Sequence, residues 1–367
     1  GACMTLHLYF AKRFLFVFLG ILTVFFLFLA LLDLIEQLRR FEGDAAFGSV
    51  LQLTLLNIPS SLYEMMPLIV ILSSIGVVLT LARSSELVVA RAAGRSGLLC
   101  IAGPAVVALL IGVVSVAAFN PIVAATSKQY SELSEKLENG GRNVLSIGAE
   151  GLWLRQGDDD GQTVIHAARS SPLATTLFDV SFLAYDNENG PFRRITARSA
   201  KLQDGVWQMF GVKIWDLGLG GNPEANATNY ISYELPSTLT AEGIRDRFGK
   251  PSSVSIWNMP SFIAGLETAG FSAIRYAVWL NMELSRPVFL LSLVLVGAAF
   301  TMRHTRLGNT GISVLTAVLV GFGLYYIRNF AQILGENGQI NMILAAWIPP
   351  IASSFLALGI ILHREDG

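Results

Sequence analysis

The chain has 367 residues, of which 53% are hydrophobic and only 14% charged, and its mean hydropathy is +0.54. This composition excludes an ordinary set of soluble domains, so lipid is the expected environment for much of the chain. The formal net charge of −1 gives no indication of a nucleic-acid partner.

Six apolar segments are predicted to cross a membrane, because a helix needs about 20 residues to span the hydrocarbon core. In chain order they cover residues 14–32, 65–82, 98–119, 287–302, 307–327 and 340–362. The fourth is too short alone, and extending it back to residue 277 brings in Glu283 and Arg286. Both charged side chains must then face protein, water or lipid headgroups.

The distribution of basic residues predicts the orientation of these helices. If the N-terminus is cytoplasmic, the inner segments carry Lys12, Arg13, Arg83, Arg91, Arg95, Arg303, Arg306 and Arg364. The short outer segments then carry only Arg39, Arg40 and Arg328. The positive-inside rule favours this orientation, which makes both termini cytoplasmic and places the long segment between the third and fourth helices outside the cytoplasm.

The sequence pattern of that long segment is typical of an all-β domain. Residues 179–185 and 205–215 alternate in polarity like half-buried strands, and turn signals lie at 186–190 and 204–205. A sandwich or jellyroll is expected. The predicted organisation is therefore residues 4–142 with helices one to three, 143–258 as an all-β domain outside the cytoplasm, and 259–367 with helices four to six.

A motif at residues 84–94 lies in the cytoplasmic turn between the second and third helices. Ser84 or Ser85 can cap a helix, Glu86 follows where the helix dipole favours an acid, and Gly94 can end it. Leu87 and Val88 give this short helix an apolar side that fits a protein groove. The candidate residues for this contact with a partner protein, called the coupling residues below, are Ser85, Glu86, Leu87, Val88, Arg91 and Gly94. An ordinary helix lying in the headgroups is the alternative.

No catalytic motif is found in the sequence. The four histidines show no ligand spacing, so no metal site is expected. Phosphate-binding loops and nucleophile elbows are also missing from the sequence. We therefore expect a protein that is not an enzyme and holds no cofactor, with any ATP hydrolysed by another chain.

The sequence resembles the lipopolysaccharide-export permeases of the LptF/LptG family, and the G-type subunit in particular. The resemblance rests on Leu-Tyr-Glu-Met-Met-Pro at 62–67 and Ser-Glu-Leu-Val-Val-Ala-Arg-Ala-Ala-Gly at 85–94. Further motifs lie at 34–40, 151–153, 286–287 and 344–349. It implies six transmembrane helices arranged three plus three around an inserted periplasmic jellyroll, in the bacterial inner membrane.

The resemblance also implies partners and a function. The partners are an F-type permease, an LptB-like ATPase homodimer seated on the helix at 85–94, and a single-span LptC-like jellyroll subunit. Lipopolysaccharide would pass from the outer leaflet of the inner membrane to periplasmic jellyrolls. Family members commonly carry a basic residue where this chain has Asp33, and an acid there is consistent with a different lipid A.

Two other functions remain open. One is a permease for another amphiphile on the same architecture, and the other is a non-transporting scaffold. The coupling motif, and glycines such as Gly311, Gly321 and Gly323 that permit close helix packing, argue against a scaffold.

Arg39 and Arg40 are the candidate lipid-binding residues. A helix that continues beyond residue 32 carries them roughly 10 Å above the hydrocarbon edge, at headgroup height. Guanidinium groups bind phosphate in bidentate fashion, so we expect them to hold the phosphates of the lipid. Simple anchoring of the helix among phospholipid headgroups is the alternative.

Overall fold

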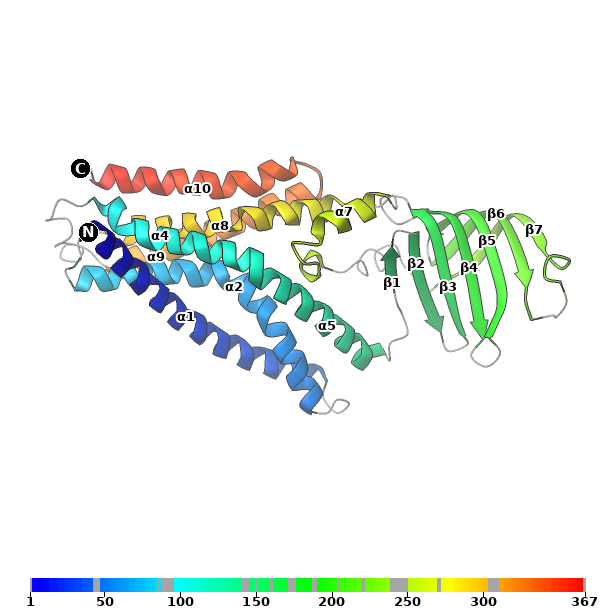
Figure 1. The fold of residues 1–367 in the computed structure, drawn as a ribbon. Coiled ribbons are helices and arrows are strands. Elements are labelled where there is room, and N and C mark those ends of the chain that lie inside the picture. Colours follow the sequence, from blue (N-terminus) through cyan, green and yellow to red (C-terminus); the bar gives the residue numbers. More distant parts are fainter. Residues whose placement is uncertain are drawn as a thin grey trace. The chain divides into compact units, whose positions relative to one another are not determined.

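The computed structural model describes residues 2–41, 47–84, 86, 96–139, 145–148, 151–158, 161–170, 176–186, 190–203, 205–218, 222–237, 250–268, 272–302 and 310–365. The chain divides into two compact units (Figure 1). A helical unit comprises Gly1–Ser131, Ser252–Trp257 and Ile274–Gly367, and a β unit comprises Glu132–Pro251 and Asn258–Ala273.

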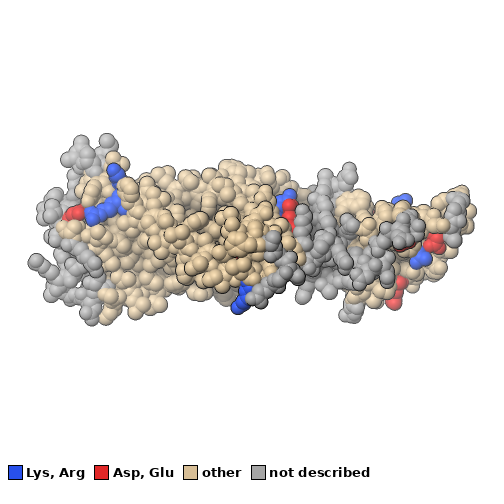
Figure 2. All heavy atoms as spheres, turned by 90° about the horizontal axis from the view of Figure 1, so that it is seen from below, with Lys and Arg blue, Asp and Glu red and all other residues tan. Residues whose placement is uncertain are grey.

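The helical unit contains six helices that are long and apolar enough to cross a membrane. They are α1 (Ala2–Arg40), α2 (Phe47–Arg83), α4 (Gly97–Val114) continuing into α5 (Asn120–Asn139), α8 (Ile274–Thr301), α9 (Thr310–Glu336) and α10 (Met342–Glu365). Over these helices, Figure 2 shows a wide band without charged side chains, with basic side chains on both sides of the band. The predicted six-span architecture with an inserted β domain is confirmed.

Helix α2 is much longer than the predicted span, which began at residue 65. It already begins at Phe47 and contains two prolines, Pro59 and Pro67. Glu64 and Pro59 interrupt the apolar run in the sequence, and this interruption hid the first half of the helix. Transmembrane helices tolerate such prolines because other groups satisfy the freed backbone carbonyls.

Glycines allow α4 to approach α1 and α8 closely, and they allow α8 to approach α2. A Cβ added to Gly112 of α4 would lie 2.4 Å from Pro287 Cα, and one added to Gly297 of α8 would lie 2.7 Å from Ser74 Oγ. Of the glycines expected to serve this purpose, only Gly321 has a near neighbour, the flexible Ile71 side chain. Among the described residues, no atom lies within 4 Å of a Cβ added to Gly311 or Gly323.

Between α4 and α5 the helix widens into one π-helical turn, η1 (Ser115–Phe119). Pro121 follows, and because proline has no N–H, the carbonyl of Ala117 loses its intrahelical donor. The indole Nε1 of Trp257 donates to this carbonyl at 3.0 Å. One residue earlier, the Ile256 N–H donates to Asn120 Oδ1 at 2.9 Å. The segment that leads back into the helical unit is therefore held at the π turn.

The β unit contains one seven-stranded antiparallel sheet in which each strand pairs with the next along the chain (Figure 1). Its strands are β1 (Leu145–Gly148), β2 (Gly151–Asp158), β3 (Gly161–Ser170), β4 (Thr176–Asp186), β5 (Gly190–Gln203), β6 (Val206–Asp216) and β7 (Thr228–Pro236). Two predicted turns lie where expected, and both use glycine with positive φ, at Gly190 (80°) and Gly205 (76°). The short helix α7 (Met259–Thr268) also belongs to this unit.

One face of the sheet forms the apolar core of the β unit. Trp207 is fully buried, and its ring lies edge-on to Phe182 with centroids 5.8 Å apart. The same core contains Leu154 of β2, Ile165 of β3 and Met209 of β6, all at most 2% exposed. The alternating pattern in the sequence therefore reports a sheet with one buried face.

Candidate functional sites

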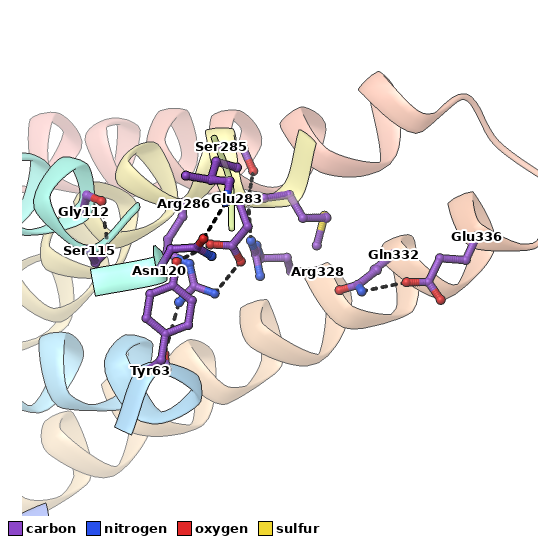
Figure 3. A network of polar contacts seen from close by, with 12 residues as sticks. Tyr63, Gly112, Ser115, Asn120, Glu283, Ser285, Arg286, Arg328, Gln332 and Glu336 are labelled. Atoms are coloured by element: carbon purple, nitrogen blue, oxygen red, sulfur yellow. Dashed lines mark hydrogen bonds and ion pairs between the residues drawn. The ribbon is translucent and has the colours of Figure 1, made fainter. Parts of the chain in front are cut away.

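A network of charged and polar side chains lies buried among the apolar helices (Figure 3). Glu283 and Arg286, one turn apart on α8, form an ion pair with 2.7 Å between Oε1 and Nη2. The hydroxyl of Tyr63 on α2 donates to the other carboxylate oxygen of Glu283. The guanidinium of Arg286 lies over the Tyr63 ring, 3.8 Å from its centroid. Together these contacts join the second and fourth membrane helices.

The prolines of α2 explain where Arg286 finds a further partner. Pro67 lacks an N–H, so the carbonyl of Tyr63, four residues earlier, has no intrahelical donor. Arg286 Nη1 donates to that carbonyl at 3.1 Å. A single arginine thus satisfies a carboxylate, a freed carbonyl and an aromatic face.

Arg328 of α9 brings a second guanidinium to the same region. It is 6% exposed, donates through Nη2 to the Met282 carbonyl at 2.7 Å, and lies 5.0 Å from the centroid of the Phe289 ring. The sequence analysis placed Arg328 in a short outer segment, which was wrong, because α9 continues for eight further residues to Glu336. Its apolar neighbours and its position near the end of an apolar run concealed the longer helix.

The chemistry of this network is structural. Tyr63, Glu283, Arg286 and Arg328 each bind another side chain of the network or a backbone carbonyl, while the Nε atoms of both arginines have no partner among the described residues. Charged groups are tolerated in an apolar interior, away from water, only when they are paired and hydrogen-bonded. The expectation that Glu283 and Arg286 face protein, water or headgroups resolves to protein, since both are buried.

Of the predicted coupling residues, Glu86 is described by the structure, whereas Ser85, Leu87, Val88, Arg91 and Gly94 lie outside the described residues. Arg13 Nη1 of α1 donates to both carboxylate oxygens of Glu86, at 2.8 and 2.9 Å, and to the Tyr9 hydroxyl at 2.8 Å. Partial burial raises the pKa of the Glu86 carboxyl, but hydrogen bonds from Arg13 and Ser84 outweigh it and lower the pKa overall. Glu86 is therefore an anion tied to α1.

The two candidate lipid-binding residues occupy the last turn of α1, and both side chains are exposed. Arg40 Nη1 lies 3.5 Å from the Tyr130 hydroxyl of α5, and its guanidinium is 5.6 Å from the centroid of the Phe41 ring. Basic groups are favoured at the C-terminal end of a helix by its dipole. Arg39 and Arg40 lie at the same end of α1, as expected. Their side chains point to different faces of the helix, because consecutive residues are rotated by about 100°.

A second polar cluster lies one to two turns below Arg40, between α1 and α2. Asp33 is 9% exposed, and its Oδ1 accepts a hydrogen bond from Asn57 Nδ2 at 2.6 Å. Gln37 is 2% exposed and donates through Nε2 to the Tyr130 hydroxyl at 2.9 Å. Thr54, on the facing helix, is 3% exposed. The sequence analysis singled out Asp33 but not its buried neighbours, which only the helix pairing reveals.

The fold and these sites define a multi-pass integral membrane protein whose described residues contain no group of three or more metal-ligating side chains. Residues 8–364 match the family "Lipopolysaccharide export system permease LptF/LptG", and the chain belongs to this family. It is therefore a transporter subunit of the inner membrane. The resemblance noted from the motifs is confirmed.

Curated relatives agree with the family assignment. The chain is 23% identical over 353 residues to the "Lipopolysaccharide export system permease protein LptG" of Haemophilus influenzae, covering 92% of each chain. It is 24% identical over 361 residues to the protein of the same name from Escherichia coli strain K12, covering 95% of this chain and 96% of the relative.

Proposed function

We propose that this chain is the G-type permease subunit of an ABC-type exporter that takes lipopolysaccharide from the outer leaflet of the inner membrane and passes it to periplasmic β-jellyrolls. The observation that carries the proposal is one chain that combines a six-helix membrane unit of this family with a β unit that has an apolar core. The partners are an F-type permease, an LptB-like ATPase homodimer and an LptC-like single-span subunit. Both termini are cytoplasmic, and the β unit is periplasmic.

The ATPase docks on the cytoplasmic segment 84–94, and Glu86 fixes the start of that segment to α1. Support comes from the two hydrogen bonds between Arg13 and Glu86, which join residues 73 positions apart. Through this ion pair, a displacement of the segment by the ATPase acts directly on α1, the helix that bears Arg39 and Arg40 at its other end.

At that outer end, Arg39 and Arg40 bind the phosphates of the lipid. Both side chains are exposed, and a guanidinium group binds phosphate in bidentate fashion through two N–H donors. The apolar part of α1 below them suits acyl chains, because only 6% of its most apolar 18-residue stretch is buried within this chain.

The lipid contact is tested by combining Arg39→Glu and Arg40→Glu in the purified complex of permeases and ATPase. We expect photo-crosslinking to lipopolysaccharide to fall at least tenfold, because two attractive charges become repulsive. Assembly is measured beside it by size-exclusion chromatography. An assembled double variant that captures lipopolysaccharide like the wild type would show that these arginines only anchor the helix.

The coupling assignment is tested by Glu86→Lys, which places two cations in contact at Arg13. We expect loss of the ATPase on purification, or export that stops in an assembled complex. The matched control is the exchange Arg13→Glu with Glu86→Arg, which restores an ion pair and should recover part of the coupling. Unchanged export by Glu86→Lys would reject the assignment.

A further inference from the structure

Three oxygen atoms of the polar cluster between α1 and α2 have no hydrogen-bond partner within the described part of the chain. They are Asp33 Oδ2, Gln37 Oε1 and Thr54 Oγ1. Each belongs to a side chain that is at least nine-tenths buried. Buried polar atoms without partners are rare in folded proteins, and each one needs an explanation.

The pairing of the two helices places these atoms together. Val17 faces Gly76, and Asp33 contacts Asn57, so α1 and α2 run antiparallel (Figure 1). One turn outward from the Asp33–Asn57 contact, α1 has advanced to Gln37 and α2 has returned to Thr54. Residues four apart lie on one face of a helix, so Asp33 and Gln37 point to the same side. The three oxygens therefore line two successive levels of one helix interface.

The chemistry of the cluster matches a cation that donates hydrogen bonds. Two of the three atoms are pure acceptors, and the third is a hydroxyl oxygen that can accept. The described partner of the Asp33 carboxyl group is the neutral amide of Asn57. A primary ammonium group supplies one positive charge and three N–H donors, which is one donor for each oxygen. A metal ion fits poorly, because the cluster offers a single carboxylate.

A neighbouring cation indicates what the ammonium is attached to. The Tyr130 hydroxyl lies between the cluster and Arg40, 2.9 Å from Gln37 Nε2 and 3.5 Å from Arg40 Nη1. Arg40 stands about 10 Å further along the helix axis than Asp33 and shares its face, since the two are seven residues apart. A phosphate bound by the exposed Arg40 therefore lies beside the cluster that would take an ammonium group.

We infer that Asp33, Gln37 and Thr54 form a recognition site for the primary ammonium of a phosphoethanolamine group whose phosphate is held by Arg40. This inference rests on the proposed function for the phosphate contact. The group is part of either the exported glycolipid or phosphatidylethanolamine of the surrounding membrane, and both sources present the same chemistry to the site.

The test compares two matched pairs of lipids on the purified complex by native mass spectrometry. The first pair is dioleoyl phosphatidylethanolamine and dioleoyl phosphatidylcholine, which share a phosphate and a positive charge but differ in N–H donors. The second pair is lipid A with and without a phosphoethanolamine substituent. A buried hydrogen bond to a charged group is worth enough for about a tenfold preference for the ethanolamine member.

We expect Asp33→Asn to remove this preference and Glu36→Gln, which alters an exposed carboxylate of the same helix, to keep it. A preference within the lipid A pair alone assigns the group to the glycolipid, and one within the phospholipid pair alone assigns it to the membrane. Equal binding within both pairs by the wild type, or an unchanged preference in Asp33→Asn, would overturn the inference.

A second variant and the binding of lipid A by the wild type make the result interpretable. If Asp33→Asn does not assemble, Thr54→Val decides by the same comparison, because it removes one acceptor without touching the carboxylate. A wild-type complex that binds no lipid A of either kind contradicts the proposed function, while the phospholipid pair still reports on the ammonium site.

Discussion

The ion pair of Glu283 and Arg286 in the helical unit leaves 3% and 10% of the two side chains exposed, whereas Asp179 and Arg169 in the β unit leave 63% and 65% exposed. Water surrounds the second pair and screens it, so its partners are nearly independent. The first pair has no water to replace a lost partner. The Glu283–Arg286 pair is therefore part of the packing of the helical unit, whereas the Arg169–Asp179 pair belongs to the surface of the β unit.

The largest effect should follow from breaking the buried network. Glu283→Gln leaves the guanidinium groups of Arg286 and Arg328 without a carboxylate in an apolar interior. We expect a loss of stability on the order of 3–5 kcal/mol, measured as a lower apparent melting temperature of the purified complex in detergent.

The double variant Glu283→Gln with Arg286→Met sharpens this prediction. It removes one buried cation together with the anion, so it should be less destabilised than Glu283→Gln alone. A double variant that melts well below the single variant would contradict the view that unpaired charge is the cause.

A smaller effect is expected from close helix packing. Gly112→Ala places a Cβ 2.4 Å from Pro287 Cα, a backbone atom in a helix that cannot move aside alone. Overpacking of this kind costs about 1–3 kcal/mol. Gly311→Ala is the matched control, because its Cβ meets no atom of the described residues within 4 Å and alanine favours the helix. Equal melting temperatures for the two variants would mean that α4 and α8 separate freely.

The smallest effect should come from the surface of the β unit. A hydrogen bond from Lys213, with a second from Trp215, lowers the pKa of Glu224 below its ordinary value of 4.5. A lowered folded-state pKa gives stability that is present above pH 4.5 and is lost as the pH falls through the lowered value. Glu224→Gln should lower the melting temperature slightly at pH 7 and by less in acid. A difference that grows as the pH falls would contradict this sign.

Much of the fold was predictable because it depends on local patterns. Apolar length identified six spans, and alternating polarity identified strands such as β4 and β6. The backward extension of α8 through Glu283 was also predictable, since a 16-residue apolar run at 287–302 is too short to span lipid. The start of α2 was missed, because Pro59 and Glu64 break the hydropathy pattern without breaking the helix.

The sites were predictable only as far as sequence neighbours define them. Arg39 and Arg40 follow an apolar helix directly, so their position at its end could be anticipated. The partner of Glu86 could not, because Arg13 is 73 residues away in the chain. The same holds for Tyr63 and Glu283, which are 220 residues apart. Such pairs depend on which helices pack together, and periodicity within one helix carries no information about this choice.

The hydrogen bonds of Trp257 and Ile256 at the π turn have a consequence for how the chain tolerates change. They hold Ser252–Trp257, a segment of the helical unit that lies between two parts of the β unit in the sequence, against the π turn. The entropy of closing a long loop grows only slowly with its length, so the length of the chain between Asn120 and Ile256 matters little once these two residues are joined. That part of the chain can therefore vary in size and sequence while the membrane helices keep their register.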